Sequence, residues 1–134
     1  MPCESIDKAA RILYTCSGCC FEGEIADRVG RRLRKDGFAR CGGSCLAGIG
    51  AGYPRFLEAA KKATDIITID GCRMVCAKRV LEKAALHPTQ SYVLSQMGLT
   101  ETNNPEDFIN YACAEIFTRQ YSKQTDDEQV NSYQ

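Results

Sequence analysis

The sequence predicts a small single-domain α/β protein, with a mostly parallel sheet of about four strands flanked by helices in a doubly wound, Rossmann-like arrangement. Two observations support this fold class. Short apolar runs of strand length alternate with longer amphipathic segments, and the links between them are short. The chain has 134 residues, of which 44% are hydrophobic, and this length suits one domain with its own core.

The first half of the chain is expected to alternate strand and helix. A strand is predicted at residues 11–15, a helix at 22–35 and a second, short strand at 38–40. The helix is predicted because apolar side chains recur every fourth residue on one face. These side chains are Ile25, Val29 and Leu33. A glycine-rich loop is predicted after the second strand.

The second half continues the alternation. Pro54 is expected to begin a helix. Proline has no backbone N–H, but the N–H groups of the first helical turn have no partner within the helix, so nothing is lost there. Residues 66–69 form the clearest strand, a β-branched run typical of a buried parallel strand. A helix is predicted at 74–86 and a fourth strand at 92–94. Asn104-Pro105 starts the last helix with a capping residue followed by proline.

The domain boundaries follow from composition. Residues 1–121 are expected to form the single domain, beginning with a polar lead-in over 1–10. Residues 122–134 are polar and are predicted to be a C-terminal tail, mobile or a frayed extension of the last helix.

Charge and hydropathy exclude several functions. Lys plus Arg and Asp plus Glu both number 17, so no general attraction to nucleic acid or anionic membrane is expected. No apolar stretch approaches the ~20 residues that cross a bilayer, and no secretory signal is evident. The protein is therefore predicted to be cytoplasmic, with its nine cysteines reduced. The basic run from Arg28 to Lys35 is interpreted as a solvated helix face.

Six cysteines occur in three clusters, each directly after a predicted strand or just beyond it. The clusters are Cys16 and Cys19, Cys41 and Cys45, and Cys72 and Cys76. Because the carboxyl ends of parallel strands meet at one edge of a sheet, we expect these thiols to converge there. Convergent thiols indicate either a metal–thiolate site or a thiol reaction centre.

Zinc is the metal we expect, because it prefers four thiolate or imidazole ligands in a tetrahedron. Gly18 allows the chain to turn so that both sulfurs of the CxxC motif reach one ion. If the following helix begins near Cys72, Cys72 and Cys76 lie one turn apart on the same helix face. An iron–sulfur cluster is the second choice, because it shares four-cysteine ligation.

Four segments of the chain resemble the DGC-domain family, named after its Asp-Gly-Cys motif. They are Cys16-Ser17-Gly18-Cys19, Cys45-Leu46-Ala47-Gly48-Ile49-Gly50, Asp70-Gly71-Cys72 and Cys76-Ala77-Lys78. The resemblance extends from about Ile12 to Gly98 and implies zinc binding, with no established activity. Arg73 departs from the family pattern, in which proline often follows the motif. Carried over motif by motif, the resemblance and the spacing give five candidate ligands: Cys16, Cys19, Cys45, Cys72 and Cys76.

Several alternatives remain open at this stage. The CxxC cysteines could instead serve thiol redox or sulfur-transfer chemistry, with Cys20 as a spare thiol. A third hypothesis is a binding module whose glycine loop and metal site present a surface to a partner protein or small anion. The protein partner, the substrate and the oligomeric state are not indicated by the sequence.

The remaining polar and thiol residues receive structural interpretations. Asp70 is expected to cap the following helix rather than orient a ligand. Cys113 is interpreted as a small buried hydrophobe and Cys3 as an exposed terminal thiol. His87, the single histidine, is expected to complement a helix C-terminus. The glycines from Gly48 onward lack the spacing of a dinucleotide-binding loop.

Overall fold

The computed structural model describes residues 11–16 and 18–131. The described residues do not include the predicted polar lead-in over 1–10, which contains Cys3, or residues 132–134. The elements are β1 (Arg11–Thr15), α1 (Phe21–Lys35), α2 (Leu46–Gly50), α3 (Pro54–Lys62), β2 (Asp65–Asp70), α4 (Cys76–Lys83), β3 (Gln90–Val93), the 3₁₀-helix η2 (Leu94–Met97) and α5 (Pro105–Asn131).

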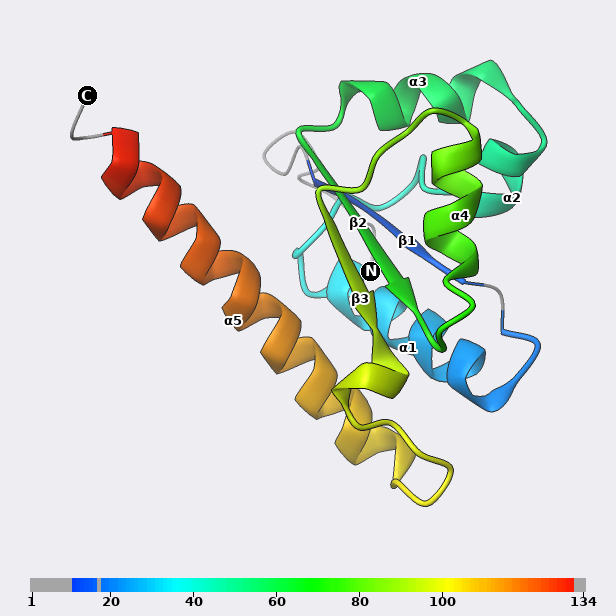
Figure 1. Ribbon diagram of the computed structural model, residues 1–134, viewed down its shortest axis with the longest axis vertical. Helices are drawn as coiled ribbons and strands as arrows, with labels where there is room; N and C mark the ends of the chain where they lie inside the picture. The colour runs from blue at the N-terminus through cyan, green and yellow to red at the C-terminus, as the bar shows by residue number, and fades with distance from the viewer. Residues whose placement is uncertain (1–10, 17, 132–134) are drawn as a thin grey trace.

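The strands form a parallel sheet in the order β1-β2-β3 (Figure 1). Ile12 is in register with Ile66, and Ile69 with Tyr92. The predicted α/β class is therefore confirmed. The central strand β2 is buried from Ile66 through Asp70, as expected for a parallel strand covered on both faces.

The two faces of the sheet carry separate layers of helices, as Figure 1 shows. On one face, Leu13, Ile67 and Ile69 pack against apolar residues of α1 and α5. On the other face, Ile12, Tyr14 and Ile66 pack against α2, α3 and α4. Alternate residues of each strand thus point into different halves of the core.

The sheet has three strands within the described residues, where about four were expected, because residues 38–40 do not form a strand. Phe38 and Ala39 are buried as their apolar character requires. The Arg40 N–H donates to the carbonyl of Arg11 at 3.0 Å, and the Arg11 guanidinium lies 4.3 Å from the centre of the Phe38 ring. This segment therefore packs beside the start of β1 without extending the ladder.

Two helices differ from the sequence-based prediction. The glycine-rich loop contains the short helix α2, which the glycines obscure because of their low helix propensity. The helix predicted at 74–86 is α4, which begins later, at Cys76, and ends at Lys83. No helix in the described part of the chain is both long and apolar enough to cross a membrane.

The basic run on α1 is not simply a solvated face, so that interpretation is wrong for several of its members. Arg28 pairs with Glu106 of α5, and Arg32 donates to Asn110 of α5 at 2.6 Å. These contacts link α1 to the first turns of α5. Arg34 points inward and donates to the carbonyl of Leu13 at 2.8 Å.

Candidate functional site

Thiols from two segments, the loop after β1 and the start of α4, lie near one another at the carboxyl ends of β1 and β2. Cys16 directly follows β1, and its sulfur accepts a hydrogen bond from the Gly71 N–H at 3.4 Å. Cys20 and Cys76 lie close enough to Cys16 to act on its pKa. The structure therefore brings Cys16 to the Asp-Gly-Cys turn and within electrostatic range of Cys76.

Burial raises the pKa of the Cys16 thiol to about 11. The hydrogen bond from Gly71 acts in the opposite direction, while Asp70, Cys20 and Cys76 add to the rise. In the absence of a cation Cys16 is therefore a protonated thiol at neutral pH. A thiol in this state is a poor nucleophile.

Gly71 lies in contact with the first turn of α1. A Cβ atom built at Gly71 would lie 2.4 Å from both the carbonyl carbon and the carbonyl oxygen of Glu22. The backbone contact places the end of β2 against the start of α1, directly after Cys20. Only glycine fits here, since no side chain can occupy the space taken by the neighbouring backbone.

Asp70 caps helix α4, which confirms the interpretation from sequence. Its side-chain oxygens accept hydrogen bonds from the N–H groups of Ala77 at 2.8 Å and Lys78 at 3.2 Å. The residue is 1% exposed, and burial raises its pKa, an effect that these two hydrogen bonds oppose. Asp70 thus fixes the start of α4, where Cys76 is the first residue.

Replacing Asp70 with alanine is expected to lower the free energy of unfolding by about 2–3 kcal/mol. The substitution leaves two N–H groups of the α4 N-terminus without their acceptor in a buried place. Urea denaturation followed by circular dichroism measures the loss. Asp107→Ala, at an exposed position in the first turn of α5, is the control and should cost less than about 1 kcal/mol. Equal losses in the two variants would contradict the capping role.

The turn between Cys72 and Cys76 contains a strained residue. Val75 has φ 47° and ψ 50°, in the left-handed region that a β-branched side chain rarely adopts. Its N–H donates to the carbonyl of Cys72 at 3.1 Å. Cys72 therefore lies in a turn before α4, and the predicted pairing of Cys72 and Cys76 on one helix face is wrong. Strain of this kind, about 1–3 kcal/mol, occurs often at functional sites.

The other predicted ligands lie around this edge at exposed positions. Cys19 is in the loop between β1 and α1. Cys45 is the N-cap of α2, and its sulfur accepts a hydrogen bond from the Gly48 N–H at 3.3 Å. Cys45 lies near Tyr14, whose pKa it helps to raise. It therefore flanks β1 on the face covered by α2.

The thiols outside the predicted set have distinct environments. Cys113 is 9% exposed in the core between α1 and α5, which confirms its interpretation as a buried hydrophobe. Cys41 is disulfide-bonded, so the expectation of reduced cysteines is wrong for this residue. The other seven described cysteines are free.

The described residues contain no group of three or more His, Cys, Asp or Glu side chains already arranged to hold a metal ion. The donors nevertheless fit zinc in kind, because they are cysteine sulfurs from separate loops at one edge. The Gly71 N–H that bonds to the Cys16 sulfur is also a group that stabilises a thiolate.

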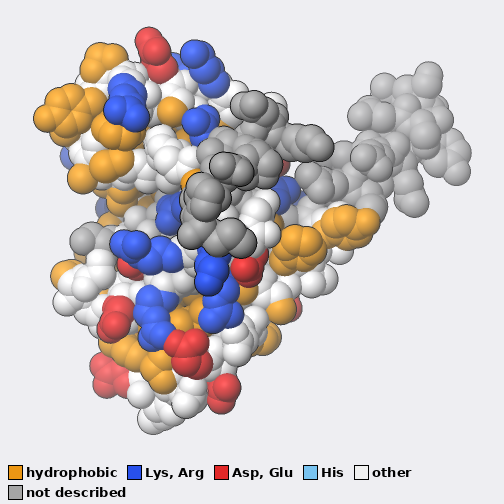
Figure 2. All heavy atoms as spheres, turned by 180° about the vertical axis from the view of Figure 1, so that it is seen from behind, with side chains coloured by type: hydrophobic (Ala, Val, Ile, Leu, Met, Phe, Trp, Pro, Cys, Tyr) orange, Lys and Arg blue, Asp and Glu red, His pale blue; other side chains and the backbone are white. Residues whose placement is uncertain are grey.

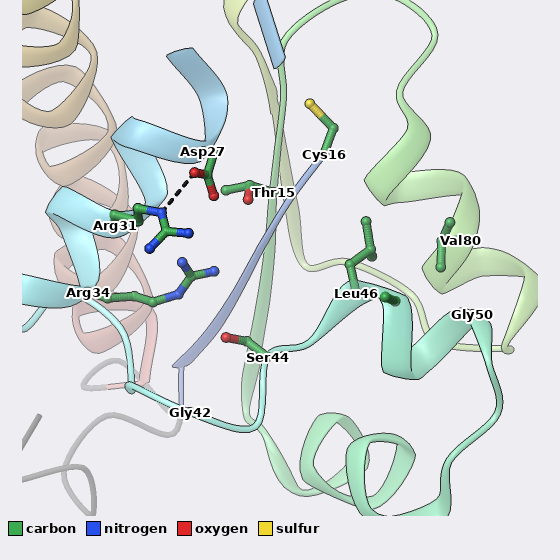
Figure 3. Close-up of a pocket in the computed structure, with 11 residues that line it drawn as sticks. Thr15, Cys16, Asp27, Arg31, Arg34, Gly42, Ser44, Leu46, Gly50 and Val80 are labelled. Atoms are coloured by element: carbon green, nitrogen blue, oxygen red, sulfur yellow. Dashed lines mark hydrogen bonds and ion pairs between the residues drawn. The ribbon is translucent and has the colours of Figure 1, made fainter. Parts of the chain in front are cut away.

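A cleft of about 560 Å³ opens beside Cys16, between α1 and α2 (Figure 3). The residues that line it are Thr15, Cys16, Asp27, Arg31, Arg34, Gly42, Ser44, Leu46, Ala47, Gly50 and Val80. Neither arginine was predicted to belong to a site, because the basic run on α1 was interpreted as a solvated face. The sequence held one indication for Arg34, which is its place on α1 directly after the core residue Leu33.

The fold and the site together define a class: a small α/β protein with free thiols and a cleft at one edge of a parallel sheet. The DGC domain matches residues 12–128 of the chain. The chain belongs to the DGC-domain family, as the resemblance in its motifs indicated.

A named relative extends this comparison. The chain is 33% identical over 95 residues to the "Anaerobic and virulence modulator AnvM" of Pseudomonas aeruginosa, and the alignment covers 71% of each protein. No solved structure matches the chain.

Proposed function

We propose that this protein binds zinc through cysteine thiolates at the carboxyl edge of its sheet and serves a regulatory role. The observation that supports this most directly is the hydrogen bond from the Gly71 N–H to the Cys16 sulfur. It joins the CxxC motif that follows β1 to the Asp-Gly-Cys turn that follows β2. Two cysteine-bearing loops that are far apart in sequence are therefore in contact at this edge of the sheet.

The ligands we propose are drawn from Cys16, Cys19, Cys45, Cys72 and Cys76. Zinc would favour the thiolate form of Cys16 and so offset the burial that holds this thiol protonated. Cys19 lies in an exposed loop and Cys72 in a turn outside any helix. Both segments are able to adjust around an ion more easily than helical residues.

The regulatory part of the proposal rests on the relative. AnvM is named a modulator, and the present chain shares its family. A zinc site built from more thiols than four ligands require permits ligand exchange, which suits metal sensing or delivery. We propose that the protein acts in the cytoplasm, where thiols are kept reduced, because every described cysteine except Cys41 is a free thiol.

The test is elemental analysis of protein purified without added metal, followed by thermal unfolding before and after chelation. We expect about one zinc ion per chain and a lower melting temperature once the metal is removed. If the protein contains iron and absorbs near 400 nm, the site holds an iron–sulfur cluster and not zinc. Metal-free protein with an unchanged melting temperature after chelation would refute the proposal.

The alternative function, thiol redox or sulfur transfer through Cys16 and Cys19, has weaker support. A redox CxxC motif requires one thiol of low pKa, whereas burial raises the pKa of Cys16. Rapid alkylation of a single thiol near neutral pH would favour this alternative.

A further inference from the structure

The cleft beside Cys16 contains two arginines that face one another. In Figure 3 the guanidinium groups of Arg31 and Arg34 point into the cleft from α1. Arg31 bonds to Asp27 at 2.8 Å. Burial lowers the pKa of Arg34 most, Asp27 opposes this effect, and repulsion from Arg31 adds a smaller lowering. Two like charges held this close favour an anion between them.

Arg34 is incompletely bonded. Its Nη2 donates to the carbonyl of Leu13 at 2.8 Å, while its buried Nε has no hydrogen-bond partner. Within the described part of the chain, Arg34 has no carboxylate partner. Arg34 is anchored through Nη2, and its Nη1, which makes no hydrogen bond within the described residues, is the donor left for a planar oxyanion.

The surroundings add positive charge. Arg40 and Arg34 both lie close enough to Tyr14 to act on its pKa, which burial raises to about 12. Arg40 also lacks a carboxylate partner in the described residues, and its buried Nε has no hydrogen-bond partner. Figure 2 shows Lys and Arg side chains gathered across the middle of the face that it presents.

The charge balance selects the kind of anion. Asp27 already neutralises Arg31 and would repel a second negative charge. The opposite wall of the cleft is formed by Leu46, Ala47 and Val80, which offer an apolar surface. A monoanion with an apolar body therefore fits better than a phosphate dianion.

We propose that this cleft binds a small organic carboxylate. The carboxylate lies at Arg34, with Arg31 beside it, and the apolar body lies against Leu46 and Val80. Cys16 lines the same cleft with its sulfur turned away from the arginines, so the ligand lies beside the segment that carries this thiol (Figure 3). The proposal stands apart from zinc binding, since none of the proposed carboxylate contacts is a thiol.

The test is an NMR titration of the full chain with benzoate, acetate and inorganic phosphate as probes. Benzoate should shift the backbone signals of residues lining the cleft and should bind more tightly than either acetate or phosphate. Arg34→Gln should weaken benzoate binding by about tenfold or more. Lys35→Gln, at the exposed neighbouring position on α1, is the matched control and should leave binding within about twofold.

A second variant tests the proposal even if Arg34→Gln does not fold. Ala47 is exposed on α2 and lines the cleft, so Ala47→Glu places a carboxylate there without disturbing the core. It should weaken benzoate binding by about tenfold through repulsion. Absence of benzoate binding, equal losses in Arg34→Gln and Lys35→Gln, or tighter binding of phosphate would each overturn the proposal. None of these outcomes depends on the zinc content that the elemental analysis would measure.

Discussion

Replacing Gly71 with alanine is expected to lower the free energy of unfolding by more than about 3 kcal/mol, or to prevent folding. The added methyl would lie 2.4 Å from the carbonyl carbon and oxygen of Glu22. These are backbone atoms within the first turn of α1, so no side-chain rotation relieves the clash. The end of β2 and the start of α1 would have to separate, and the hydrogen bond to Cys16 would break with them.

Gly50→Ala is the matched control for this prediction. Gly50 is the last residue of α2, and a Cβ there would meet only Val80, at an ordinary distance of 3.8 Å. The free energy of unfolding should stay within about 1 kcal/mol of the parent protein, because alanine is the better helix former. Chemical denaturation of both variants measures the two free energies of unfolding. A Gly71→Ala protein as stable as Gly50→Ala would show that the contact is looser than the structure has it.

The Asp-Gly-Cys motif acquires a physical meaning from these contacts. Asp70 caps α4, Gly71 allows the approach of α1, and Cys72 begins the turn that ends at Cys76. Two of the three residues are therefore structural. They hold the start of two helices against the end of β2, which fixes the loops on which the thiols lie.

The sequence predicted the elements whose pattern is local. β1 was expected at residues 11–15 and occupies them, and α1 differs from its expected start by one residue. Both patterns are set by neighbouring side chains alone. Residues 38–40 have the apolar character of a strand, but the Phe38 N–H donates to Leu33, so of these residues the Arg40 N–H alone bonds to β1 within the described chain. Pairing depends on this tertiary position and not on local character.

The site was predictable only in outline. Convergence at the sheet edge follows from parallel strands, and the contact of Cys16 with Gly71 agrees with it. The cleft was not predictable, because Arg34 belongs to a basic run whose other arginines pair with α5 or with Asp27. Which arginine of such a run turns inward depends on the docking of the helix, and the sequence alone does not contain that information.

Replacing Cys16 with serine is expected to lower zinc affinity by roughly a hundredfold or more. A serine hydroxyl has nearly the shape of the thiol and still accepts the Gly71 N–H, so the fold should remain intact. It does not ionise near neutral pH and is a poor zinc ligand. Competition with a chromophoric zinc chelator measures the change in affinity.

Cys113→Ser separates the loss of a ligand from the loss of a buried thiol. Cys113 is more buried than Cys16 but packs between α1 and α5, away from the sheet edge. This variant should lose some stability, because a hydroxyl replaces a small apolar group, and yet keep its zinc affinity. If both variants lose affinity together, the effect is one of folding. If neither does, Cys16 is not a ligand, and the site must be sought among the other proposed thiols Cys19, Cys45, Cys72 and Cys76.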